Sequence, residues 1–166
     1  MKRFLLVFLL MLFLLNACGV QNNKESDAFT FYYLEKEFQY GQAPGMIASE
    51  LRESTSQRRD LMYLMNLYLM GPTDESHIMP LPKGTRINCK AEENGSVTLE
   101  LSGASRLLSD SEFTLAGTCL ALTCFDITDT PEVTVCNTKS SITISRNNIL
   151  LEDNHASYAQ TTEETQ

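Results

Sequence analysis

Hydrophobic and polar residues alternate most clearly in two short segments near the middle of the chain, residues 87–91 and 97–101. An alternation with a period of two places one face of a β-strand in the core and the other in water. Asn94-Gly95 lies between the segments and is typical of a tight hairpin turn, because glycine tolerates a positive φ. These residues predict an antiparallel hairpin in a sheet that is covered on one side.

Weaker patterns predict four more strands. The aromatic-rich stretch 29–34 predicts a first strand, and residues 46–52 predict an extended edge strand. Near the other end, residues 132–137 and 142–145 are separated by a turn at 138–141, so they predict a second hairpin.

Two segments carry apolar residues at helical spacing. The first runs from residue 58, and its apolar stripe is Leu61, Leu64, Met65 and Tyr68. Ser54 and Gln57 have the spacing of a capping box ahead of it, and Gly71-Pro72 is expected to end it. We expect the methionines of this stripe to pack in the core, although such a stripe can also serve as an adaptable binding surface.

The second helix is expected to begin at Ser109, which has the spacing of a capping box with Glu112. It runs to about residue 125, and the side chains expected in the core are Phe113, Ala116, Cys119 and Leu120. The predicted order is β-β-α-β-β-α-β-β. This order predicts one α+β domain over residues 29–148, with two helices packed on one face of a small mixed β-sheet. Residues 149–166 are polar and acidic, and they are expected to be disordered.

The N-terminus has the layout of a secretory signal, with Lys2 and Arg3 ahead of an unbroken apolar run at 4–15. That run is shorter than the ~20 residues of a membrane-spanning helix. The sequence Leu15-Asn16-Ala17-Cys18 that follows resembles the bacterial lipobox. The resemblance implies that signal peptidase II cuts between Ala17 and Cys18 and that Cys18 carries diacylglycerol. An ordinary signal peptide with an incidental Cys18 is the alternative.

A lipidated Cys18 implies a protein held on the extracytoplasmic face of the bacterial cell membrane, because two acyl chains anchor a protein firmly. Residues 1–17 would be the removed signal, and the polar residues 18–28 would form a flexible tether. The whole chain carries a net charge of −8. This charge argues against a nucleic-acid partner, and it leaves the lipid as the membrane anchor.

Four cysteines follow the anchor, namely Cys89, Cys119, Cys124 and Cys136. An even number in an exported protein is compatible with disulfides, whereas free cysteines also serve as small core side chains. Cys119 and Cys124 lie on different sides of the predicted helix, so they cannot bond to each other while it is intact.

Few residues offer catalytic chemistry. His77 lies in a predicted loop and His155 in the tail, so Cys89 with His77 is the one nucleophile pair to consider. Adjacent Glu92 and Glu93 would point to opposite faces of a hairpin, which makes them a poor carboxylate pair for glycoside cleavage.

An acidic loop after the second helix could in principle hold calcium, although its residues are more typical of solvated charge. The loop residues are Asp126, Asp129 and Glu132. The sequence contains no phosphate-binding glycine loop, and we expect neither a metal nor a cofactor.

Three blocks of sequence together resemble the GerMN domain, a module named after a lipoprotein of spore formation and germination. They are LMGPT at 69–73, PKGT at 82–85 and the strand SVTLELS at 96–102. Members of that family carry similar blocks in the same order, and the resemblance covers about residues 29–148. The motif residues carried over are Gly71, Pro72, Pro82, Gly84, Thr85 and Gly95.

The resemblance implies a non-catalytic module similar to the ring-building modules of spore-envelope and secretion assemblies. The expected function is therefore binding to envelope proteins, or self-assembly, in sporulation, germination or another envelope process. An enzyme or accessory protein that binds peptidoglycan or another envelope glycan is the alternative.

Overall fold

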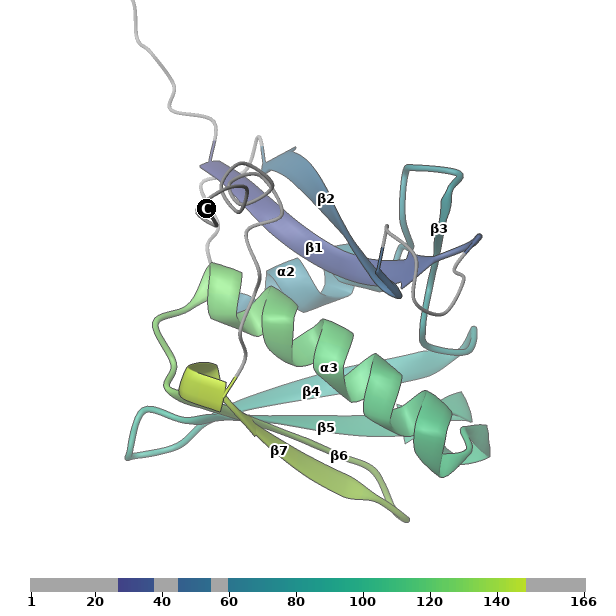
Figure 1. Cartoon of the computed structure of the whole chain (residues 1–166). Coiled ribbons are helices and arrows are strands. Elements are labelled where there is room, and N and C mark those ends of the chain that lie inside the picture. The colour runs from purple at the N-terminus through teal and green to yellow at the C-terminus, as the bar shows by residue number, and fades with distance from the viewer. Residues whose placement is uncertain (1–26, 38–44, 55–59, 149–166) are drawn as a thin grey trace, which may run out of the picture.

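The computed structural model describes residues 27–37, 45–54 and 60–148. The predicted signal, lipobox cysteine Cys18 and acidic tail lie outside the described residues. In the described part, helices form a middle layer between two β-sheets (Figure 1).

The smaller sheet is antiparallel and has the order β2-β1-β3. Its central strand is β1 (Asp27–Glu35), which pairs with β2 (Ile47–Ser54) from Asp27 to Leu34 and with the two-residue β3 (His77–Ile78) at one end. Phe29, Phe31 and Tyr33 alternate along β1 and are all buried, because they face the helices. The predicted first strand and edge strand are both confirmed.

The larger sheet has the order β4-β5-β6-β7. The predicted hairpins are both present, as β4 (Thr85–Ala91) with β5 (Val97–Gly103) and as β6 (Glu132–Cys136) with β7 (Ser141–Ser145). Strands β5 and β6 pair in parallel, so the chain must cross over between them. The short 3₁₀ helix η1 (Ala104–Leu107) and helix α3 (Asp110–Ile127) form this crossover. A second 3₁₀ turn, η2 (Arg146–Asn148), follows β7.

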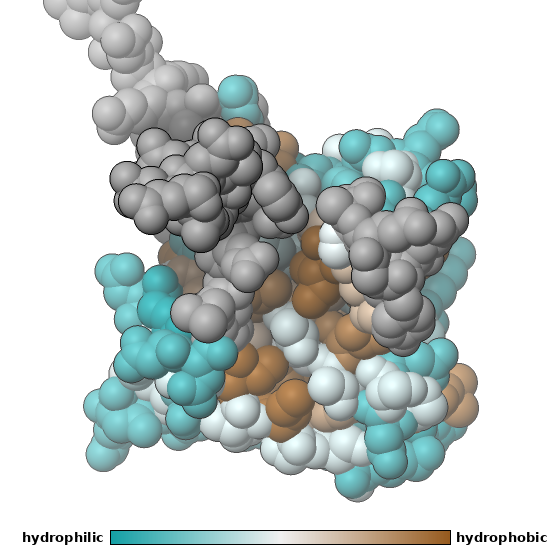
Figure 2. All heavy atoms as spheres, viewed as in Figure 1, coloured by the Kyte–Doolittle hydropathy of each residue, from teal (hydrophilic) through white to brown (hydrophobic). Residues whose placement is uncertain are grey.

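Helix α3 contacts β1 on one side and β6 and β7 on the other. Side chains on most of its circumference are therefore buried, which is the pattern of a helix enclosed by protein. The predicted capping box between Ser109 and Glu112 is present. Figure 2 shows hydrophobic residues gathered along the middle of the face where α3 lies. Among the described residues, no helix is both long and apolar enough to cross a bilayer.

The shorter helix α2 (Leu61–Tyr68) packs on β4 and buries Leu64, as predicted. Its start differs from the prediction. Asp60 is the N-cap and accepts a hydrogen bond from the backbone N–H of Tyr63, whereas Ser54 ends β2. The expected cap at Ser54 is therefore wrong, because strand pairing with Asp27 extends through that residue.

The α+β class with two α-helices is confirmed, but the strands divide between two sheets instead of forming one. The separation follows from α3, whose buried surface is too wide for one sheet to cover. The structure also adds β3, which the polar sequence around His77 did not predict.

Candidate binding site

The loop after α2 contains the GPT block of the sequence motif. Gly71 has a φ of +90°, and its backbone N–H donates to the carbonyl oxygen of Tyr68 at 3.0 Å, so it ends the helix as predicted. The next residues turn back toward β2. The backbone N–H groups of Thr73 and Asp74 donate to the carboxylate of Glu50 at 2.9 and 3.1 Å, and the Thr73 hydroxyl donates at 2.7 Å.

Glu50 is thus the centre of a buried polar cluster. Arg52 donates from Nε to Oε1 of Glu50 at 2.5 Å and from a terminal nitrogen to the carbonyl oxygen of Gly71. Its guanidinium also lies over the rings of Phe31 and Tyr33, at 5.2 and 5.7 Å from their centroids. Burial alone would raise the pKa of Glu50, but hydrogen bonds from Arg52, Thr73 and the Asp74 backbone outweigh it and lower the pKa to about 2.

His77 also belongs to this cluster. The sequence had suggested that His77 lies in a loop, and the structure corrects this. It lies in β3, stacks on Tyr33 at 6.4 Å between ring centroids, and places Nδ1 3.7 Å from Oε2 of Glu50. Glu50 and Arg52 were not predicted as site residues from the sequence. The available signal was their spacing of two in a predicted strand, which puts both side chains on one face.

The second motif block forms a β-turn. The carbonyl oxygen of Pro82 accepts hydrogen bonds from the backbone N–H of Thr85 at 3.1 Å and from its hydroxyl at 2.8 Å. Gly84 has a φ of +90° inside this turn. Its carbonyl oxygen lies so close to Gly103 that a Cβ atom there would be 2.4 Å away. The turn therefore packs directly against the end of β5. Gly95, with a φ of +82°, makes the predicted turn between β4 and β5.

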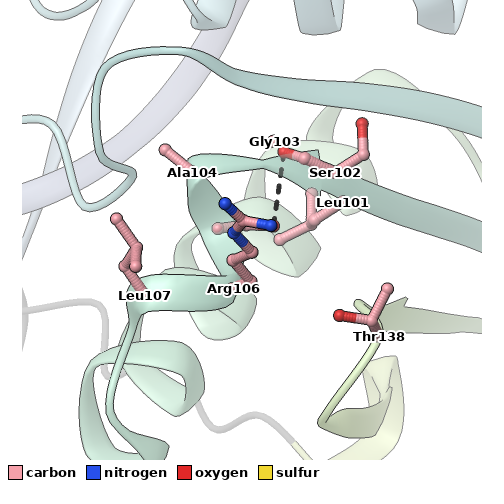
Figure 3. Close-up of a pocket in the computed structure, with 8 residues that line it drawn as sticks. Leu101, Ser102, Gly103, Ala104, Arg106, Leu107 and Thr138 are labelled. Atoms are coloured by element: carbon pink, nitrogen blue, oxygen red, sulfur yellow. Dashed lines mark hydrogen bonds between the residues drawn. The ribbon is translucent and has the colours of Figure 1, made fainter.

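A pocket of about 480 Å³ opens beside this contact, where β5 ends and η1 begins (Figure 3). Leu101 and Ala104 supply apolar surface, and Thr138 lines the pocket from the turn between β6 and β7. The remaining lining residues are Ser102, Gly103, Ser105, Arg106 and Leu107.

Contacts from the same turn fix the position of η1. Lys139 donates from Nζ to the carbonyl oxygen of Arg106 at 2.7 Å, and the Asn137 side chain donates to that of Ser105 at 3.2 Å. The Leu107 side chain remains 74% exposed next to the pocket. Within the described part of the chain, no carboxylate lies within ion-pair distance of Arg106. The rim therefore presents a leucine and a cation, which suits an apolar group accompanied by a negative charge.

This pocket was not predicted, since its lining combines residues 101–107 with the distant Thr138, and the 3₁₀ helix within 101–107 has no strong sequence pattern. None of the predicted motif residues lines this pocket. Pro82, Gly84 and Thr85 form the adjacent turn, while Gly71 and Pro72 lie in the loop held by Glu50.

The four cysteines of the domain are free thiols, and the two in α3, Cys119 and Cys124, are fully buried. Burial raises the pKa of Cys119 to about 12 and that of Cys89 to about 11, and it also raises the pKa of Cys124 and Cys136. A thiol with a raised pKa is a poor nucleophile at neutral pH. Cys89 and His77 lie in different sheets, so the pair considered from the sequence does not form.

The other catalytic candidates are also separated or occupied. Glu92 and Glu93 are exposed in the turn after β4. Asp126 accepts a hydrogen bond from the backbone N–H of Thr30 at 2.7 Å, which ties α3 to β1. Among the described residues, no group of three or more His, Cys, Asp or Glu side chains has the arrangement of a metal site, and this includes Asp129 and Glu132.

No protein-family model and no curated protein sequence matches the chain. Two solved structures of the sporulation protein GerM from Bacillus subtilis are similar to it. Its first GerMN domain aligns at 12% identity with a TM-score of 0.55, over 70% of this chain and 86% of that one. Its tandem GerMN domains align at 12% identity with a TM-score of 0.54, over 70% of this chain and 40% of that one.

A third structure, from Clostridium perfringens, aligns at 13% identity with a TM-score of 0.43, which is too low to support an argument about this chain. The two GerM alignments exceed 0.5, and one domain of GerM matches nearly in full. The low identity limits the comparison to the backbone arrangement. In that respect the chain has a GerMN-like fold, with the extent of a single GerMN domain.

Proposed function

We propose that the chain is an extracytoplasmic lipoprotein, anchored through Cys18, whose domain binds other envelope proteins without catalysing a reaction. The lipobox-like sequence at 15–18 supports the anchor. The similarity to GerMN domains of a sporulation protein supports a role in sporulation or a related envelope process.

The observation that carries the binding role is the pocket beside η1. It combines apolar lining with an exposed Leu107 and an Arg106 that faces no carboxylate among the described residues. Its lining contains neither an aromatic ring nor a carboxylate. Glycosidase sites depend on a pair of carboxylates, so this lining argues against glycoside cleavage at the pocket.

Complementation of a strain that lacks the gene tests both parts of this proposal. Cys18→Ser should leave unprocessed precursor and lose function, because the acyl acceptor is gone. Leu107→Asp should lose function while the protein remains folded and anchored, because it places a charge in the apolar part of the surface. The readouts are the deletion phenotype, the mass of the membrane-bound chain and circular dichroism.

Two kinds of control make this test specific. Leu51→Asp changes a leucine that is 69% exposed on β2, far from the pocket in sequence and in the other sheet, and it should complement fully. His77→Ala and Glu92→Ala remove the candidate catalytic groups and should also complement. Loss of function in a folded, anchored His77→Ala or Glu92→Ala variant would replace binding by catalysis. Loss of function in Leu51→Asp, or a functional Leu107→Asp, would remove the pocket from the proposal.

A further inference from the structure

The described sheets have four edge strands, and three of them carry features that discourage pairing with another chain. Strand β3 has only two residues. Strand β2 carries Glu50, Arg52 and Glu53, and β4 carries Arg86 and Lys90. Short length and charged side chains are the usual protection of a sheet edge.

Strand β7 has none of these features. Its sequence is Ser-Ile-Thr-Ile-Ser, without charge, proline or glycine, and its β-branched residues favour strands. Among the strands that the structure describes, it pairs only with β6. An uncharged edge of five residues is a ready template for another strand.

The backbone groups that β7 leaves open can be identified from its ends. The N–H of Arg146 donates to the carbonyl oxygen of Pro131, and the carbonyl oxygen of Ser140 accepts from the N–H of Asn137, so both residues face β6. Backbone groups of successive residues alternate between the two sides of a strand. Ile142 and Ile144 therefore also face β6, and the N–H and C=O groups of Ser141, Thr143 and Ser145 face away from the sheet.

The sequence of β7 reads the same in both directions. An antiparallel pair of two copies centred on Thr143 would place Ser141 opposite Ser145, and Ile142 opposite Ile144. The three outward-facing residues of each copy would then form about six backbone hydrogen bonds, two for each facing pair. This match is isologous, as a two-fold dimer requires.

We propose that β7 pairs with β7 of a second copy of this chain, joining two four-stranded sheets into one of eight strands. The two-fold axis runs between the two Thr143 residues, perpendicular to the sheet, and places α3 of both copies on the same face. Ile142 and Ile144 are only half-buried by their own domain and would be covered by the partner's isoleucines. On the outer face, the Thr134 and Thr143 hydroxyls are 2.9 Å apart, and the two central threonines would make a similar cross-strand contact.

Charge and area set the strength of this dimer. Each copy carries a net charge of −8, so the copies repel each other at low ionic strength. Pairing of one short edge also buries less than the ~1,200 Å² of a standard stable interface. The dimer is therefore expected to be weak, and salt should strengthen it by screening the repulsion. The proposal goes beyond the η1 pocket and does not require a partner there.

Sedimentation equilibrium of the full chain in density-matched detergent tests this dimer. The expected result is a dimer fraction that rises with protein concentration and with salt. Thr143→Lys should weaken the dimer at least tenfold, because it apposes two charges at the axis. Asn88→Lys is the matched control, since it adds the same charge at an exposed position of the opposite edge strand, and it should leave the dimer unchanged.

Oxidation of a Thr143→Cys variant in membranes provides a second measurement. Facing hydrogen-bonded residues have Cα atoms ~5.5 Å apart, which a disulfide can span. Peptide mass spectrometry should find the two substituted positions linked to each other, and Asn88→Cys should not give the equivalent link. A monomer at every concentration and salt level would overturn the proposal, as would a Thr143→Lys variant that is folded and dimerises like the wild type. Neither result would alter the test of Leu107.

Discussion

Gly103 shows how one missing side chain positions the candidate pocket. It lies at the end of β5 with a φ of +71°, and the carbonyl oxygen of Gly84 occupies the space of its absent Cβ. Glycine is the residue that combines this backbone conformation with such a close approach. The contact brings the turn at 82–85 against the end of β5, next to the residues that line the pocket.

We expect Gly103→Ala to lower the free energy of unfolding by about 3 kcal/mol, because it combines backbone strain with a steric clash. Gly95→Ala is the control. Gly95 has a φ of +82° but open space around it, so its loss should be about 1 kcal/mol. Urea denaturation of both variants measures the difference. If both variants lose the same free energy of unfolding, the close contact between Gly103 and Gly84 does not affect stability.

At the scale of elements, α3 is covered by both sheets, and small residues on it permit close packing. Gly117 is the clearest case. A Cβ atom at this position would lie 2.9 Å from Cγ2 of Ile142 and 3.7 Å from Cβ of Val135. The lack of a side chain therefore lets the helix approach β6 and β7 closely.

Gly117→Ala sets two effects against each other. Alanine favours the helix by about 1 kcal/mol over glycine, whereas overpacking of a core costs about 1–3 kcal/mol. Because Cγ2 of Ile142 is fixed on a β-branched side chain, we expect a net loss of about 1 kcal/mol. Ile142→Ala removes the methyl group that would clash. In a double-mutant cycle measured by denaturation, the double variant should therefore lose less free energy of unfolding than the sum of the two single losses. Simple additivity would contradict the proposed clash.

The sequence predicted the elements whose signals are local. The β4–β5 hairpin followed from alternation and Asn94-Gly95, and the start of α3 followed from its capping box. The division into two sheets did not follow, because the pairing partners of β1 and β6 depend on contacts between distant segments. The even distribution of small apolar residues around α3 was a usable signal that this helix is covered on both sides.

The candidate site was less predictable than the fold. Glycines and prolines of the motif blocks were correctly placed in turns, since their backbone preferences are intrinsic. Glu50 and Arg52 have no such preference, and their cluster forms only when the loop after α2 folds back on β2. Leu107 and Arg106 likewise became notable only through their place beside the pocket.

At the scale of the whole molecule, the Glu50 cluster connects β2, the loop after α2 and β3. Apart from this cluster, the pairing of β2 and β3 with β1 in the smaller sheet is the main connection between these segments. The pKa of Glu50 is about 2 in the folded chain and near 4.5 in the absence of its partners. By linkage, this difference contributes on the order of 3 kcal/mol to stability at neutral pH.

Because the folded pKa is the lower one, this contribution is complete above about pH 5 and is lost as the pH falls from 4.5 toward 2. Glu50→Gln should therefore destabilise the chain by about 3 kcal/mol at pH 7, and by much less at pH 3. Glu100→Gln breaks an exposed pair with Lys90 and should change the stability much less than Glu50→Gln does at pH 7, because solvent screens that pair. Urea denaturation at both pH values tests this, and a loss from Glu50→Gln that does not change with pH would contradict it.

The position of β1 has a consequence for the order of synthesis. This strand is the first described element, and its aromatic face is covered by α3, with Thr30 bonded to Asp126 across 96 positions of sequence. A chain made from its N-terminus therefore produces its most aromatic strand long before the helix that shields it. Such distant contacts slow folding, since a long loop must close before they form. The smaller sheet thus reaches its final packing only after α3 has been made.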